Sequence, residues 1–200
     1  MGRTQLFHIE DIQKGLCTLL KKQGFGSFSM QLVAKELQIP IGSLYHRYPS
    51  KIEMIADLWL SILQNFQNEF QKILLAEKDP IVAGKEAALL VASWMEKEPE
   101  FAYLLSSVRK EDLNHQEWSP KYKTLEKKLK IQLQRIWIKW SDHLTKSKVT
   151  AEEIFILKSV IVDIPMNVAK PFIGKKFPPY LFTFIESTYQ FHISKLNLIR

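Results

Sequence analysis

The sequence predicts an all-α protein made of a small N-terminal domain, 1–51, and a larger C-terminal domain, 52–200. Apolar residues recur at helical spacing along nearly the whole chain, while runs of β-branched residues alternating with polar ones are scarce. Of the 200 residues, 46% are hydrophobic and 12% aromatic, which is enough for a substantial core. Because no Gly/Ser-rich or Pro-rich linker divides the chain, we expect the domains to share a packed junction or a continuous helix.

Three helices are predicted in the smaller domain, the second and third of them short. Apolar residues from Ile9 to Leu20 mark the first, which we expect to end near Gly24, because glycine readily takes the left-handed conformation that stops helices. Ser29 is placed to cap the second by accepting a hydrogen bond from a backbone N–H. Pro40 then interrupts the pattern, and the third helix follows at once. Two short helices therefore flank a tight turn.

The larger domain is predicted to begin with a long helix. Ser50 and Glu53 have capping-box spacing, and the apolar stripe that follows them continues to the Asp79-Pro80 break. Five more helices are predicted, and the residues that mark them are 87–95, Pro99, Ser119-Pro120, the Thr150 and Glu153 capping box, and Pro178-Pro179. Pro165 should kink the penultimate helix, because proline removes a backbone donor and clashes with the preceding turn.

Basic residues are concentrated near the N-terminus. The net charge of the chain is +7, which suits a polyanionic partner, and residues 1–51 carry seven basic side chains against three acidic ones. A second stretch, 121–148, has nine basic side chains against two acidic ones. Because these lysines interleave with an apolar stripe, we interpret them as a solvated helix face, with an additional DNA or acidic-partner surface as the alternative.

The compartment is suggested by the cysteine content and by the lack of a long apolar segment. The single cysteine, Cys17, excludes an intramolecular disulfide, and no charged-then-apolar leader opens the chain, so we expect a protein of the reducing cytoplasm. The most apolar stretch, 154–169, contains Lys158, Asp163 and Pro165 and falls short of the roughly 20 residues that span a bilayer. We expect a soluble protein without a membrane partner.

Residues 29–51 carry the main functional signal. A short helix, a tight turn and a second short helix with polar and aromatic tips are what docking in the DNA major groove requires, since the groove admits one helix. The alternative is that these are two ordinary core helices, because helix-turn-helix geometry occurs in many unrelated proteins.

The motif Ile39-Pro40-Ile41-Gly42-Ser43-Leu44-Tyr45-His46-Arg47-Tyr48-Pro49-Ser50-Lys51 resembles the TetR/AcrR family. That family has Val-Ser-x-Gly-x-Leu-Tyr, a His or aromatic pair, and then a Lys that opens a long capped helix. With the preceding helices the resemblance covers residues 8 to 60, whereas the rest of the chain is similar only in being helical. The resemblance implies a regulator that binds operator DNA. It would act as a homodimeric repressor on a palindromic site and be released from it by an effector.

The resemblance also implies which side chains contact DNA. Ser29, Tyr45, His46 and Lys51 would bind phosphates, since each can donate a hydrogen bond to a phosphate oxygen. The residues expected to read base edges are Gln31, Ile41, Ser43 and, as a further candidate, Arg47. Gly42 would let the backbone approach the duplex closely.

Three residues depart from the family pattern. Pro40 replaces the usual hydroxyl residue, although proline tolerates a first helical position. Gln38 stands where glycine is frequent, which leaves the turn geometry open. Ile41 stands where a polar or basic residue is frequent, and it suggests apolar contact with a thymine methyl group.

The larger domain is expected to sense a small apolar or aromatic effector and to form the dimer through its last two helices, as the resemblance implies. The aromatic and thioether side chains that could line an interior for a ligand are Trp59, Phe66, Trp94, Met95, Phe101, Tyr103, Trp137, Trp140, Phe155 and Met166. Each taken alone is more readily explained as packed core, so none is assigned to a ligand.

Two other classes of function compete with that of a DNA-binding regulator. The chain has no Gly-rich phosphate loop, nucleophile elbow or metal-spaced His/Cys cluster, so we expect neither an enzyme nor a cofactor or metal site. Cys17 lies among apolar residues, where a buried, inert thiol is expected. The second alternative is a helical apolar-ligand-binding or interaction protein with degenerate DNA binding, which the departures at Pro40 and Gln38 would favour.

Overall fold

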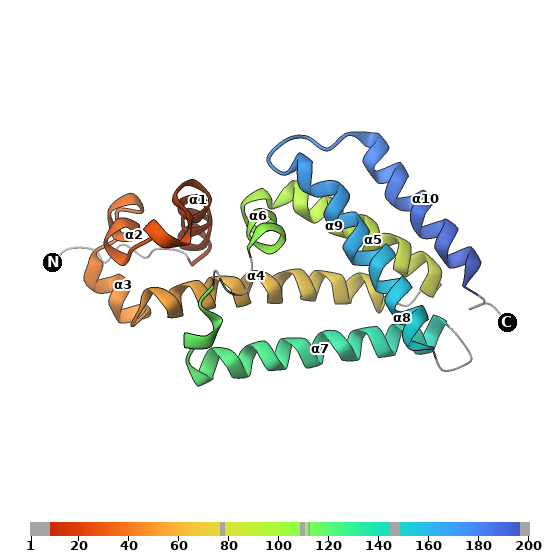
Figure 1. Cartoon of the computed structure of the whole chain (residues 1–200), viewed down its shortest axis with the longest axis horizontal. Helices are drawn as coiled ribbons and strands as arrows, with labels where there is room; N and C mark the ends of the chain where they lie inside the picture. Colours follow the sequence, from red (N-terminus) through yellow and green to blue (C-terminus); the bar gives the residue numbers. More distant parts are fainter. Residues whose placement is uncertain (1–8, 77–78, 109–110, 112, 145–148, 197–200) are drawn as a thin grey trace.

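The computed structural model describes residues 9–76, 79–108, 111, 113–144 and 149–196. Within these ranges the protein is helical and contains no strand, so the all-α prediction is confirmed. Figure 1 shows a small group of N-terminal helices at one end of the long helix α4 and the remaining helices gathered along its other part. The core is continuous between the two groups.

The N-terminal group consists of α1 (Ile9–Ser27), α2 (Met30–Glu36) and α3 (Ile41–Arg47). The regular path of α1 breaks at Gly24, where φ is 70° and ψ is 170°, close to the predicted end. Cys17 is buried in α1, as expected from the sequence, and burial raises the pKa of its thiol. A Cβ on Gly15 would collide with the Leu37 side chain, so α1 lies closely against the end of α2.

The turn between α2 and α3 is a Schellman motif. The N–H of Ile39 bonds the carbonyl of Ala34 at 2.9 Å, and the N–H of Gln38 bonds the carbonyl of Lys35 at 3.3 Å. Gln38 has a φ of 53° and so takes the left-handed conformation that glycine usually supplies at this position. Pro40 precedes α3 and makes no side-chain cap, as its chemistry requires. The helix-turn-helix is therefore regular, although Gln38 and Pro40 differ from the residues usual at these positions.

The next four α-helices are α4 (Lys51–Leu74), α5 (Pro80–Lys97), α6 (Pro99–Ser107) and α7 (Pro120–Leu144). The Ser50 hydroxyl caps α4 by accepting from the N–H of Glu53 at 3.2 Å. Helix α4 lies beside both α5 and α7 (Figure 1). A short 3-10 turn, His115–Glu117, precedes α7.

The chain ends with α8 (Ala151–Lys158), a π-helical turn (Ser159–Asp163), α9 (Ile164–Ala169), a 3-10 turn (Lys170–Phe172) and α10 (Pro179–Lys195). The Thr150 and Glu153 capping box at the start of α8 is present as predicted. Near Pro165 the helix is interrupted by the π turn, in which the N–H of Ile164 bonds the carbonyl of Ser159, five residues back. Proline has no backbone N–H to donate to the preceding turn, so a disruption near Pro165 is expected from the sequence. In the structure this disruption is a π turn.

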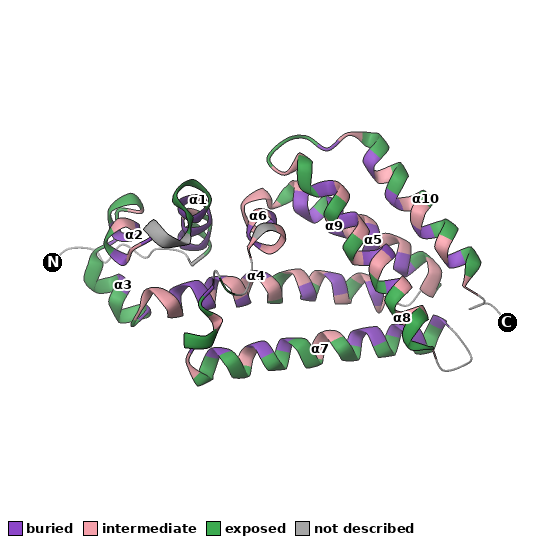
Figure 2. Ribbon diagram, viewed as in Figure 1, coloured by how far each residue is buried: buried purple, intermediate pink, exposed green. Residues whose placement is uncertain are grey.

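The helices of the larger domain meet closely at Gly84 on α5. A Cβ there would collide with the hydroxyl of Tyr189 on α10 and lie 2.7 Å from the Trp140 ring on α7. The Tyr189 hydroxyl donates to the carbonyl of Ile81 at 2.8 Å, and the Trp140 indole donates to the carbonyl of Pro80 at 3.0 Å. Figure 2 shows the buried faces of α4, α5 and α7 turned towards this interior.

Candidate nucleic-acid interface

Helix α3 presents almost its whole surface to solvent. Its one buried residue is Leu44, which is 1% exposed and fixes the helix to the small core together with the neighbouring Tyr48. The six predicted contact residues on this helix, Ile41, Gly42, Ser43, Tyr45, His46 and Arg47, are all exposed (Figure 2). Two of them are large and apolar, with Ile41 41% exposed and Tyr45 44% exposed. The fold therefore displays this helix without covering it.

The predicted contacts outside α3 lie at or near the starts of α2 and α4. The Ser29 hydroxyl caps α2 by accepting from the N–H of Leu32 at 3.2 Å, an arrangement that leaves its own proton to donate. Gln31 is exposed in the first turn of α2. The Lys51 ammonium stands 5.7 Å from the centre of the Phe28 ring, so the start of α4 is held beside the residue that precedes Ser29.

A chain of hydrogen bonds, which sequence reasoning missed, links the end of α3 to α4 and α7. The Nε of Arg47 donates to the Tyr48 hydroxyl at 3.2 Å, and this hydroxyl donates to Oδ2 of Asp57 on α4 at 3.1 Å. The Tyr122 hydroxyl on α7 donates to Oδ1 of the same carboxylate at 3.5 Å. Burial raises the pKa of both tyrosines, and the charge of Asp57 raises it further. We call these four residues the Asp57 network.

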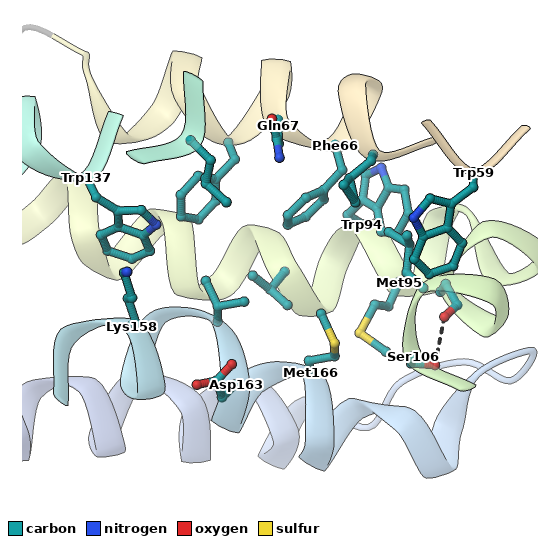
Figure 3. Close-up of a pocket in the computed structure, with 17 residues that line it drawn as sticks. Trp59, Phe66, Gln67, Trp94, Met95, Ser106, Trp137, Lys158, Asp163 and Met166 are labelled. Atoms are coloured by element: carbon teal, nitrogen blue, oxygen red, sulfur yellow. Dashed lines mark hydrogen bonds between the residues drawn. The ribbon is translucent and has the colours of Figure 1, made fainter. Parts of the chain in front are cut away.

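The helices that follow α3 form a partly open cavity of about 380 Å³ (Figure 3). Its walls come from α4, α5, α6 and α7 and from the segment that contains the π turn. Six of the ten aromatic and thioether residues considered from the sequence line it, namely Trp59, Phe66, Trp94, Met95, Trp137 and Met166. The Phe66 and Trp94 rings pack edge to face with centroids 5.1 Å apart.

The other four of these residues lie elsewhere. Trp140 is buried in the core beside Gly84, Phe101 borders a separate polar depression, and Tyr103 carries the Lys21 ammonium 5.6 Å from its ring centre. The expectation that Phe155 lies in the interior is wrong, because this side chain is 70% exposed. Helix α8 is short and buries only Leu157, and Phe155, two residues earlier, faces the other way.

Four polar residues border the cavity: Gln67, Ser106, Lys158 and Asp163. Gln67 is only 4% exposed, and its Oε1 has no hydrogen-bond partner among the described residues. Sequence reasoning missed this residue. The signal was present, since Gln67 interrupts the apolar face of α4 between Phe66 and Phe70.

Two further surfaces are relevant to partners. The basic side chains of α7 are exposed, and the apolar stripe between them includes the buried residues Tyr122 and Leu129. This exposure agrees with a solvated face and with the alternative of a partner surface. Lys146 and Lys148 lie outside the described residues. Helix α10 exposes three large aromatic side chains, Tyr180 at 66%, Phe184 at 51% and Phe191 at 59%. Their spacings of four and seven residues put them on one helix face, which we call the α10 aromatic face.

Within the described ranges, no helix is both long and apolar enough to cross a membrane. Nor does that part of the chain contain a group of three or more His, Cys, Asp and Glu side chains placed to hold a metal ion.

Comparison with solved structures identifies the fold. A transcriptional regulator of the TetR/AcrR family from Thermobifida fusca superposes with a TM-score of 0.61 at 11% identity, covering 96% of this chain and 97% of the other. PfmR, a TetR family transcriptional regulator from Thermus thermophilus, gives 0.62 at 16% identity over 93% and 98%. AmtR from Mycobacterium smegmatis gives 0.51 at 18% identity over 95% and 88%. No curated protein sequence matches the chain.

The helix-turn-helix region also matches at the level of sequence. Residues 14–58, from α1 into α4, fit the profile of the bacterial regulatory proteins of the tetR family. This segment holds the exposed face of α3, the turn at Gln38 and the Lys51 start of α4. Residues 14–58 are therefore similar to the bacterial regulatory proteins of the tetR family, and the chain as a whole has the fold of the solved regulators compared above.

Proposed function

We propose that the protein is a repressor that binds a palindromic operator as a homodimer and is released from it by a small apolar effector. The exposed face of α3 carries this proposal. Ile41 and Tyr45 are large apolar side chains left open to solvent on a helix that buries only Leu44. A partner that covers them would remove apolar area from water, and the major groove is wide enough to accept one such helix.

The assignment of individual contacts follows from their chemistry. Ser29, Tyr45, His46 and Lys51 would donate to phosphate oxygens and fix the position of the duplex. Gln31, Ile41 and Ser43 would reach base edges, with Ile41 against a thymine methyl group. Arg47 is a further reader, and its bond to Tyr48 holds the near end of the guanidinium in place. Nothing stands within 4 Å of a Cβ built on Gly42, which suits close approach of a backbone.

The dimer is supported by the α10 aromatic face. Three exposed aromatic side chains on one face are expensive to leave in water, and a second copy of the chain would cover them by the same residues, as twofold symmetry requires. Such a dimer would place two copies of α3 on one side of the duplex, about one helical turn or roughly 34–36 Å apart. The two half-sites of the operator would then be inverted repeats.

The cavity supports effector control because α4 belongs to both regions. Its first residue, Lys51, stands in the candidate DNA interface, and its later residues, from Trp59 to Phe70, line the cavity. A ligand that fits the cavity better when α4 is displaced would favour a state in which the two α3 helices no longer match the groove. The repressor would then leave its operator.

Titration of the purified full-length protein onto the intergenic DNA upstream of its own gene tests the proposal. We expect retention of a double-stranded fragment that weakens steeply as salt rises, because phosphate contacts release counterions. A random fragment of equal length is the control. A folded protein that retains no fragment would refute DNA binding and leave the alternative, a helical apolar-ligand-binding protein with degenerate DNA binding.

A further inference from the structure

The walls of the cavity are built for an apolar ligand. Of the 17 lining residues, 13 have apolar side chains, contributed by helices on every side. A volume of about 380 Å³ lies within the range of cavities that hold small organic molecules. Two ring pairs, Phe66 with Trp94 and Phe70 with Trp137, stand along the α4 wall with centroids 5.1 and 5.7 Å apart. A ligand in this partly open space would exchange water for apolar contacts along these walls.

One polar group is buried in this wall. Gln67 reaches from α4 with its amide nitrogen towards the cavity (Figure 3), and its carbonyl oxygen is buried without a hydrogen-bond partner among the described residues. Proteins rarely leave a buried amide oxygen unpaired. Rotation of the amide by half a turn brings this oxygen to the cavity side, so the same residue can offer a ligand either a donor or an acceptor.

The remaining polar residues do not select a charged ligand. Ser106 directs its hydroxyl to the carbonyl of Ala102 in its own helix at 2.7 Å. Lys158 and Asp163 are exposed, carry opposite charges and border the cavity from the two ends of the π turn, which brings residues five apart onto one face. An ionised group deep in the cavity would lose its hydration, and the buried polar group there is the neutral amide of Gln67, whereas Lys158 and Asp163 are exposed to solvent.

We infer that the ligand of this cavity is an uncharged, largely aromatic or aliphatic molecule with one hydroxyl group, and that Gln67 selects it by pairing with that hydroxyl. A hydroxyl both donates and accepts, so it matches the amide in either orientation. The inference rests on the proposed function, in which this cavity holds the effector. It adds the chemistry of the effector and the residue that discriminates it.

Calorimetric titration of the full-length protein with three probes of one shape tests this assignment. The probes are 2-naphthol, which has the hydroxyl, 2-methylnaphthalene, which lacks it, and 2-naphthoate, which is charged. We expect 2-naphthol to bind roughly three- to tenfold more tightly than 2-methylnaphthalene, the gain of one net hydrogen bond, and 2-naphthoate to bind most weakly. Equal affinity for the first two probes, or tighter binding of 2-naphthoate, overturns the inference.

Matched variants locate the preference. Gln67→Leu should bind 2-naphthol and 2-methylnaphthalene equally, whereas Gln64→Leu, the same change at an exposed position of α4 away from the cavity, should keep the wild-type preference. Gln67→Met serves if the leucine variant does not fold. A preference that survives both changes at Gln67 overturns the role of this residue.

DNA retention by the same wild-type preparation, measured without a probe, separates the two proposals. Retention of operator DNA together with equal binding of the first two probes refutes the ligand assignment alone. Loss of retention with an intact preference for 2-naphthol refutes the repressor and supports the assignment of the ligand class.

Discussion

At the scale of single residues, the turn between α2 and α3 depends on a conformation that its sequence does not favour. Gln38 occupies the left-handed position of a Schellman motif with a φ of 53°, where a side chain crowds the following carbonyl. Glycine adopts this conformation without that penalty. The helix-turn-helix is therefore held by its surroundings, chiefly by burial of Ile39 and Leu44 on either side of the turn.

Replacing Gln38 by glycine should raise the free energy of unfolding by about 0.5–1 kcal/mol, because relief of the left-handed strain exceeds the added entropy of the unfolded chain. Urea denaturation followed by circular dichroism measures the difference. Gln64→Gly, on the exposed face inside α4, is the matched control and should lower stability by about 1 kcal/mol. Loss of stability in both variants would show that the Gln38 side chain makes a contribution of its own.

A substitution at Gly42 is expected to change stability and DNA binding in opposite directions. A Cβ there meets nothing within 4 Å, so Gly42→Ala should leave the fold intact and stabilise α3 by up to about 1 kcal/mol. The same methyl group would stand where the proposed operator approaches the backbone, and we expect at least a tenfold weaker affinity for the operator fragment. Melting temperature and fluorescence anisotropy measure the two effects. Unchanged affinity would mean that the duplex does not come close to this residue.

At the scale of helices, the Asp57 network joins three elements that sequence reasoning treated separately. One carboxylate on α4 accepts hydrogen bonds from Tyr48, next to α3, and from Tyr122, on α7. The pKa of both tyrosines is raised above the ordinary value near 10, so the folded protein keeps protons that the unfolded chain releases in alkali. This part of the stability is complete below pH 10 and is lost as the pH rises above it.

Changing Asp57 to Asn should lower the free energy of unfolding at pH 7 by about 1–3 kcal/mol, since hydrogen bonds to a charged acceptor are lost. The variant should nevertheless lose less stability than the wild type above pH 10, because removal of the negative charge lowers the pKa of Tyr48 and Tyr122. Denaturation at several pH values, with ultraviolet titration of tyrosinate, checks both statements. Parallel stability curves for the two proteins would exclude the electrostatic role of Asp57.

The helices show how far local sequence determines structure. The caps at Ser29, Ser50 and Thr150 are where the sequence places them, because a cap depends on residues three positions apart. The sequence predicts that the helix is disrupted near Pro165, but it does not predict that the disruption is a π turn, since the form of a disrupted helix depends on what packs against it. Asp57 and Gln67 escaped notice for the same reason. Their partners, or lack of partners, are set by helices distant in the chain.

At the scale of the whole molecule, the two proposed activities meet in α4, and the proposed dimer contact on α10 lies apart from both. The exposure of α3 was predictable from the motif around Tyr45, which resembles the family pattern in spacing and in residue type apart from Pro40 and Ile41. The sequence indicated that the last helices form the contact between subunits, but not which residues they expose. Exposure of Tyr180, Phe184 and Phe191 depends on which side of α10 packs against α5.

Introducing a charge on the α10 aromatic face should yield a folded monomer. Phe184→Glu places a carboxylate in the centre of the proposed contact, where its burial against a second copy is unfavourable. Light scattering coupled to size exclusion measures the mass. Ile138→Glu, at a site 49% exposed on α7, is the control and should remain dimeric. The monomer should also bind the operator more weakly, since two linked α3 helices bind with a higher effective concentration than one.

Cys17, buried in α1, has a practical consequence. A thiol must ionise to react quickly with alkylating reagents, and burial both shields this sulfur and raises its pKa. A second cysteine placed on the surface, for example by Gln31→Cys, would therefore accept a nitroxide label while the native thiol stays silent. In a twofold assembly that label reports one inter-subunit distance, so pulsed electron spin resonance could follow the separation of the two recognition units as a ligand is added.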